Sequence, residues 1–95
     1  MASKGCVYWI RLPEHTDILT QGYVGVSVSG SELRFRRHIK CAENGSKLIV
    51  HVAIRKYCDK IIIEDVVFAD PEYCLELEFK LTRTRVPRWQ STRML

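Results

Sequence analysis

The sequence predicts an α+β fold, within the broad α/β class, because segments typical of strands alternate with clear helix starts. Three segments gather β-branched and aromatic side chains, as strands do: residues 6–10, 22–28 and 60–68. Helix-start signals follow the second and the third of them, at residues 29–32 and 70–72. The 95 residues, of which 46% are hydrophobic and 27% charged, fit a single globular domain over residues 1–95.

The first two strands are expected to pair as an antiparallel hairpin. Residues 6–10 are apolar, residues 22–28 alternate as a strand does, and a polar loop interrupted by Pro13 joins them. Tyr8 and Tyr23 can then place their hydroxyls on one face of the hairpin. The alternative is core filling, which is the commoner role of a strand tyrosine.

The first helix is expected to end at about Glu43. Ser29 and Glu32 have the spacing of a capping box, and Ser31 is the alternative cap. Asn44-Gly45 is a good left-handed stop. The apolar stripe of this helix follows helical spacing: Phe35, Ile39 and Ala42.

Residues 47–57 are ambiguous, because their apolar positions fit a strand and a helical face equally well while their composition favours a strand. Residues 60–68 contain three consecutive isoleucines and are predicted to form a strand. Asp70-Pro71-Glu72 opens a last helix that is expected to run to about Thr84, and Pro87 ends regular structure.

Charge is unevenly distributed along the chain, although the net charge is only +4. Residues 31–60 carry eight Lys or Arg against three Asp or Glu, and residues 61–78 carry six acids and no base. Residues 79–95 carry five bases and no acid. Two basic segments separated by an acidic one suggest a surface for a polyanion, with carboxylates that can hold a cation. The alternative is a solvated surface whose charges are sorted by chance.

No apolar run approaches the ~18 residues of a membrane span, and the apolar stretch near the N-terminus is too short for a signal peptide. We therefore expect a protein of cytoplasmic type without membrane contact, and a nuclear location is compatible with the same features. The cysteines lack zinc-knuckle spacing and are expected to stay reduced and fill gaps in the core: Cys6, Cys41, Cys58 and Cys74.

Polar residues on the two helices need a function or a partner. Arg34 and His38 are four residues apart and can both point at one phosphate, unless they belong to a solvated basic surface. Glu78 lies on the side of the last helix that faces the core, whereas Glu76 can pair with Lys80 on the surface. A divalent metal is one partner for Glu78, and hydrogen bonding as a structural acid is the alternative.

Taken together, these residues resemble the GIY-YIG nuclease domain. The two name-giving motifs of that family have counterparts in Cys6-Val7-Tyr8 and Tyr23-Val24-Gly25. Arg34 and His38 follow with the Arg-x-x-x-His spacing of the family. The motifs occur in the family's order along the chain.

The resemblance continues to the C-terminal part of the chain. Residues 75–81 look like the leucine-rich helix that bears the metal-binding Glu of the family, with Glu78 as the match. Pro87-Arg88-Trp89-Gln90 is similar to the closing Pro-x-aromatic-Asn motif, and the resemblance implies a supporting role for Gln90. The chain departs from the family pattern at Cys6, where Gly is usual, at Gln90, where Asn is usual, and in a longer loop between the tyrosines.

The resemblance implies a three-stranded antiparallel sheet flanked by helices in the order β-β-α-α-β-α. In that order residues 47–57 form a helix, against their composition. The resemblance also implies a hydrolase: a metal-dependent DNA endonuclease that leaves 5′-phosphate and 3′-hydroxyl ends.

The resemblance further implies a role for each site residue. Glu78 would hold one Mg²⁺ or Mn²⁺ per active site, mostly through water, near the leaving oxygen. Tyr8 would be the general base or base relay. A phenol has a pKa of ~10, so it needs a cation beside it to act as a base near neutral pH, and Arg34 would be that cation. Arg34 would also neutralise charge in the transition state. Tyr23 would position water or a phosphate oxygen, and His38 would assist proton transfer.

Non-specific contacts with the DNA backbone are assigned to basic residues outside this site: Lys40, Arg83, Arg85 and Arg88. A domain of this size has little surface for reading bases, so target choice is expected from an appended DNA-binding domain, a partner protein or a homodimer. Two rival interpretations remain: a non-catalytic nucleic-acid-binding module on the same fold, and a small structural or partner-binding protein.

Overall fold

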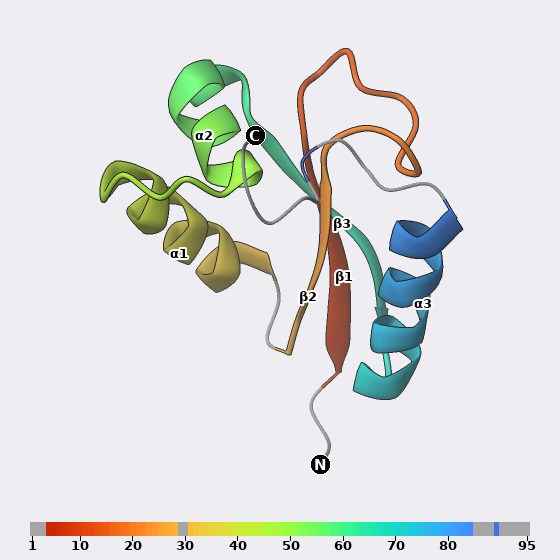
Figure 1. Ribbon diagram of the computed structural model, residues 1–95. Coiled ribbons are helices and arrows are strands. Elements are labelled where there is room, and N and C mark those ends of the chain that lie inside the picture. Colours follow the sequence, from red (N-terminus) through yellow and green to blue (C-terminus); the bar gives the residue numbers. More distant parts are fainter. Residues whose placement is uncertain (1–3, 29–30, 85–88, 90–95) are drawn as a thin grey trace.

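The computed structural model describes residues 4–28, 31–84 and 89, with the side chains at positions 83 and 84 excepted. Within these residues the predicted α+β fold is confirmed, including the order β-β-α-α-β-α, and a 3-10 turn, η1, is added after the second helix (Figure 1). The elements are β1 (Gly5–Arg11), β2 (Tyr23–Ser27), α1 (Ser31–Glu43), α2 (Ile49–Tyr57), η1 (Cys58–Lys60), β3 (Ile62–Ala69) and α3 (Pro71–Thr84).

The strand β1 is central in the sheet, and it runs antiparallel to both neighbours in the order β2-β1-β3. Tyr8 of β1 lies opposite Gly25 of β2, so the predicted hairpin is present. In the pairing of β1 with β3 the register shifts between Val7 and Tyr8 of β1, which is the signature of a β-bulge. A bulge increases the local twist of a strand, and this one lies at the tyrosine of the first sequence motif.

The two faces of the sheet carry separate cores, because alternate residues of β1 point to opposite sides. Figure 1 shows α1 and α2 on one side of the sheet and α3 on the other. We define the α1–α2 side by its buried core: Tyr8, Ile10, Leu12, Ala42, Val50, Ala53, Ile54 and Trp89. We define the α3 side by its own core, against which Leu77 and Leu81 pack: Val7, Trp9, Val24 and Cys74.

The burial pattern of α2 explains why residues 47–57 form a helix despite their composition. Val50, His51, Ala53 and Ile54 are buried, at the spacing that a helix places on one face. A strand would instead have buried every second residue, yet Leu48 is exposed. The need to cover the sheet therefore overrides the preference of the β-branched residues.

The end of α1 is where the sequence predicts it. Gly45 has a φ of +87°, and its N–H donates to the carbonyl of Ala42 at 3.1 Å. The N–H of Ser46 donates to the carbonyl of Cys41 at 3.0 Å. This pair of hydrogen bonds is a Schellman motif, which needs a residue that tolerates positive φ. The motif turns the chain back toward α2. Ser29, the expected cap of this helix, lies outside the described residues.

The prediction that all four cysteines fill gaps in the core is wrong for two of them. All four thiols are free, and Cys6 and Cys74 are buried, but Cys41 and Cys58 are exposed. Cys41 directly precedes the buried Ala42, and a single step along a helix rotates a side chain away from the core. Cys58 lies in η1, where no residue is buried.

The start of α3 also follows the prediction. Pro71 is its first residue, and the N–H of Cys74 donates to the carbonyl of Asp70 at 3.0 Å, which closes the first turn. Among the described residues, none of the helices combines the length and the apolar character needed to cross a membrane.

Candidate functional site

Tyr8 and Tyr23 lie side by side on the α1–α2 side of the hairpin. Their ring centroids are 6.3 Å apart, and Tyr8 is fully buried while Tyr23 is half-buried. Gly25 makes this arrangement possible, because a Cβ at that position would lie 2.5 Å from Cζ of Tyr8. The glycine of the second motif is therefore required for space: the Tyr8 ring occupies the volume that a side chain would fill.

The electrostatics of the two phenols link four side chains from four elements. Burial raises the pKa of Tyr8 to about 12, assisted by Tyr23 and Glu78, while a hydrogen bond with Arg34 and the positive charge of Arg34 oppose the rise. Burial likewise raises the pKa of Tyr23, with a contribution from Glu78 and opposition from Arg34. Arg34 thus acts on Tyr8 in the predicted direction, but burial outweighs it. β1, β2, α1 and α3 each contribute one member of this group.

Arg34, near the start of α1, has an unsatisfied polar atom. Its Nε is buried, and the described residues offer it no hydrogen-bond partner. By contrast, Arg36 on the same helix donates to Glu32 at 2.8 Å on the surface. A buried guanidinium N–H without an acceptor indicates a place that an anion or an ordered water completes. Phosphate oxygens are suitable acceptors for such a donor.

His38 contacts the hydroxyl of Tyr8, and a chain of hydrogen bonds continues from it. Its Nε2 lies 3.1 Å from Oη of Tyr8, and its Nδ1 lies 2.9 Å from Nε2 of His51. Nδ1 of His51 in turn lies 2.7 Å from Oγ of Ser46. Because both ring nitrogens of His38 face protein groups and the residue is only 8% exposed, Arg34 remains the group available to a phosphate.

The two imidazoles of this hydrogen-bonded chain, those of His38 and His51, are neutral near neutral pH. Burial, with the neighbouring His51 and Arg34, lowers the pKa of His38 to about 4. Burial, with the nearby Arg55, also lowers the pKa of His51. A neutral imidazole has one N–H donor and one acceptor nitrogen, so each ring can accept a proton on one side and release one on the other.

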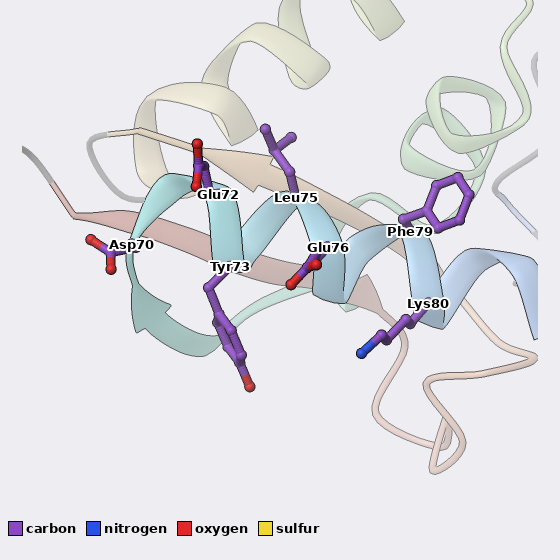
Figure 2. A pocket seen from close by; sticks show the side chains of 7 residues that line it. All are labelled: Asp70, Glu72, Tyr73, Leu75, Glu76, Phe79 and Lys80. Atoms are coloured by element: carbon purple, nitrogen blue, oxygen red, sulfur yellow. The ribbon is translucent and has the colours of Figure 1, made fainter.

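The two glutamates in the middle of α3 occupy different environments. Glu78 is half-buried, and burial raises the pKa of its carboxyl while Arg34 lowers it. Glu76 is exposed and, with Lys80, faces a shallow hollow of about 800 Å³ on the outer surface of α3 (Figure 2). The described lining of that hollow includes none of the predicted catalytic residues: Asp70, Glu72, Tyr73, Leu75, Glu76, Phe79 and Lys80.

A half-buried carboxylate such as that of Glu78 is a suitable ligand for a hydrated magnesium ion. Among the residues that the structure describes, no group of three or more His, Cys, Asp or Glu side chains is arranged to hold a metal. Zinc sites require such a group, whereas Mg²⁺ keeps several waters and accepts one or two carboxylates. A half-buried carboxylate with a raised pKa would gain a partner for its ionised form from such a cation.

The structure describes only some of the residues predicted to contact DNA or to close the domain. Lys40 is exposed on the last turn of α1. Trp89 is buried in the core of the α1–α2 side, and its N–H donates to the carbonyl of Gly22 at 3.0 Å. The remaining predicted positions lie outside the described part of the chain: the side chain of Arg83, and Arg85, Arg88 and Gln90.

His51 and Ser46 were not among the predicted site residues. A signal for His51 exists once residues 47–57 are taken as a helix, because it is then a polar residue on the buried face with Val50 and Ile54. Ser46 carries no such signal, since its contact with His51 depends on the turn that ends α1.

Comparison with known proteins identifies no relative: the chain matches no family model, and no curated protein or solved structure is detectably similar to it. The resemblance to GIY-YIG nuclease domains therefore stays a prediction from the motifs.

Proposed function

We propose that the chain is a metal-dependent DNA endonuclease of the GIY-YIG type, which hydrolyses phosphodiester bonds to 5′-phosphate and 3′-hydroxyl ends. The observation that carries the proposal is the convergence of two phenols, a guanidinium and a carboxylate from β1, β2, α1 and α3. Within this group the guanidinium has a buried N–H without a described partner. These are the groups that phosphodiester hydrolysis requires.

Arg34 binds the scissile phosphate in this proposal. Its buried Nε would donate to a non-bridging oxygen, and its charge would stabilise the extra negative charge of the transition state. Such preorganised donors are worth about 100- to 1000-fold in rate. Tyr23, half-buried beside Tyr8, orients the attacking water or a phosphate oxygen.

Tyr8 is the general base or base relay. With a pKa of about 12, the Tyr8 hydroxyl is protonated near neutral pH. It can therefore take a proton from the attacking water only if it passes its own proton to another group. His38 lies 3.1 Å from this hydroxyl and is neutral, so it can accept the proton that Tyr8 releases.

Glu78 would hold one Mg²⁺ or Mn²⁺, mostly through water, and the cation would supply charge neutralisation at the departing 3′ oxygen. Glu78 is half-buried, and its negative charge contributes to the raised pKa values of both tyrosines, so its carboxylate is within electrostatic reach of them.

The proposal is tested by nicking of plasmid DNA and of labelled duplex, nicked, branched and flap DNA in Mg²⁺ or Mn²⁺. We expect Glu78→Ala to lower the nicking rate by about 100-fold or more, because the proposed protein ligand of the cation is lost. Glu76→Ala is the matched control, since Glu76 lies on the same helix but is exposed and faces the outer hollow. This control should nick at the wild-type rate.

Three outcomes would contradict the proposal or a part of it. Salt-sensitive DNA binding without nicking of any substrate at any metal concentration would favour a binding module. No salt-sensitive DNA affinity at all would favour a structural or partner-binding protein. Equal rates for the two glutamate variants would remove Glu78 from the site.

A further inference from the structure

The hydrogen-bonded chain that begins at Tyr8 continues to the surface loop between α1 and α2. Its links are 3.1 Å from Tyr8 to His38, 2.9 Å from His38 to His51 and 2.7 Å from His51 to Ser46. The chain reaches the surface at its loop end: Tyr8 is fully buried, His38 and His51 are 8% and 4% exposed, and Ser46 is half-buried. Figure 1 shows this loop on the opposite side of the sheet from α3, which carries Glu78.

We propose that Ser46, His51 and His38 form the path by which the proton of Tyr8 leaves the domain, with release to solvent at Ser46. The inference rests on the proposed function in one respect, namely that Tyr8 acts as the base. His51 and Ser46 are positioning residues in this path, because they act through His38 and touch neither water nor phosphate at the reacting centre.

The path works by a balanced shift of protons along neutral rings. The Tyr8 O–H bond breaks as an N–H bond forms at Nε2 of His38, and Nδ1–H of His38 breaks as Nε2 of His51 gains a proton. Nδ1–H of His51 then passes its proton to Oγ of Ser46, whose own hydroxyl proton goes to a water. Both rings end in the opposite tautomer, and no imidazolium accumulates. The net change is a phenolate at Tyr8 and a hydrated proton at the loop.

A purely structural role does not account for this arrangement. Two imidazoles are buried in a small core where apolar side chains would avoid the cost of desolvating polar groups. Every ring nitrogen has a partner, and Ser46 also accepts the N–H of Leu48 at 3.3 Å, which fixes its oxygen toward His51. The chain is thus continuous, satisfied and oriented.

Charged and titratable groups from four elements act on the two ends of the path. Tyr23 from β2, Arg34 from α1 and Glu78 from α3 act on the Tyr8 end. Arg55 from α2 acts on the His51 end, where its positive charge disfavours a second cation. Burial, with Arg34 beside His38 and Arg55 beside His51, favours neutral rings along the path, which the tautomer shift requires.

The sharpest test compares Ser46→Thr with Ser46→Val. The two replacements have nearly the same shape, but only threonine keeps the hydroxyl. We expect Ser46→Val to lower the single-turnover cleavage rate by about tenfold or more, with unchanged DNA affinity, and Ser46→Thr to retain the wild-type rate. Equal rates in the two variants at equal melting temperatures would overturn the proposal.

A second variant, His51→Ala, opens a space where free imidazole can bind. We expect added imidazole to restore part of the lost rate in this variant and to leave Ser46→Val unchanged. Failure of imidazole to restore any rate to a folded His51→Ala protein would count against the path.

Nuclear magnetic resonance of the free protein separates failure of the path from failure of the proposed function. With labelled histidine and tyrosine, we expect two neutral rings near neutral pH. Ser46→Val, but not Ser46→Thr, should shift the ring nitrogens of His51 and His38 and the Cζ resonance of Tyr8. This result would support the path even if the wild type cuts no DNA, whereas an unmoved Tyr8 resonance would overturn it.

Discussion

The two sides of the sheet share the central strand β1 but are built from different kinds of contact. On the α3 side, the core consists of apolar groups such as Val7, Trp9 and Val24. On the α1–α2 side, Tyr8 and His38 are buried within the core and are bonded to each other. The comparison shows where this small domain accepts the cost of burying polar groups: on the face where each can be bonded to the next.

The contrast also explains why α3 contributes a single residue to the candidate site. Its buried face is occupied by Cys74, Leu77 and Leu81, which hold the helix against the sheet. Glu78 lies beside this face, half-buried, and acts electrostatically on both tyrosines. In our proposal the α3 side is therefore a scaffold that positions one carboxylate, whereas the α1–α2 side provides the proton-transfer groups.

The largest expected effect on the nicking rate is at Arg34, on the α1–α2 side. Arg34→Gln should lower the nicking rate by about 100- to 1000-fold, because it removes both the charge and the buried donor that face the phosphate in our proposal. Arg37→Gln, on the exposed part of the same helix, is the control and should change the rate little. Comparable losses in both variants would show that α1 acts only as a basic surface.

A second prediction concerns acid stability, which should depend on the α1–α2 side. The pKa of His38 is about 4 in the folded protein and 6.5 in the unfolded chain, so the unfolded chain binds more protons between these values. The free energy of unfolding should therefore fall as the pH drops from 6.5 to about 4, by about 3 kcal/mol. Urea unfolding at a series of pH values measures this slope.

The matched variant for this prediction is His38→Gln, which keeps a hydrogen-bonding side chain but does not titrate. Its stability should change less over the same pH range, although His51, whose pKa is also lowered by burial, leaves a residual slope of the same sign. If wild type and variant lose the same stability on acidification, the acid sensitivity resides elsewhere in the molecule.

A third prediction compares one glycine from each side. A Cβ at Gly25 would meet the Tyr8 ring at 2.5 Å, whereas one at Gly5 would lie 3.0–3.1 Å from Pro71 and Cys74 of α3. Gly25→Ala should cost about 1–3 kcal/mol of stability and displace the Tyr8 hydroxyl from His38, so that nicking falls as well. Gly5→Ala should destabilise the fold by less and leave the rate per folded molecule unchanged. A normal nicking rate in Gly25→Ala would show that the position of the Tyr8 hydroxyl beside His38 does not matter for nicking.

The sequence predicts the architecture well because its signals are local. Asp70-Pro71 and Asn44-Gly45 determine helix ends through their own backbone preferences, and the structure places the ends there. For residues 47–57 local composition favoured the wrong state, and only the resemblance led to the helix. Burial on the sheet decides that segment, and burial is a property of the whole fold.

The site is only partly predictable for the same reason. Tyr8, Arg34 and Glu78 are recognisable from motif spacing, and the structure brings them within electrostatic reach of each other. The link from His38 to His51 depends on how α2 packs on α1, and that from His51 to Ser46 on the turn that ends α1, which no spacing rule encodes. The dominance of burial over Arg34 in setting the pKa of Tyr8 likewise requires knowledge of the packed core.

The smallest expected effect concerns Lys40, which lies exposed on α1 and tests whether the α1–α2 side also carries the DNA backbone. Lys40→Ala should weaken DNA binding a few-fold, lower the slope of log affinity against log salt by about 1, and act equally on all sequences, because one phosphate contact is lost. Lys56→Ala, an exposed lysine of α2, is the comparison on the same side. Binding titrations at several salt concentrations measure both slopes. An unchanged slope for Lys40→Ala would mean that this lysine makes no contact with the DNA backbone, and that any backbone contact on the α1–α2 side comes from other residues.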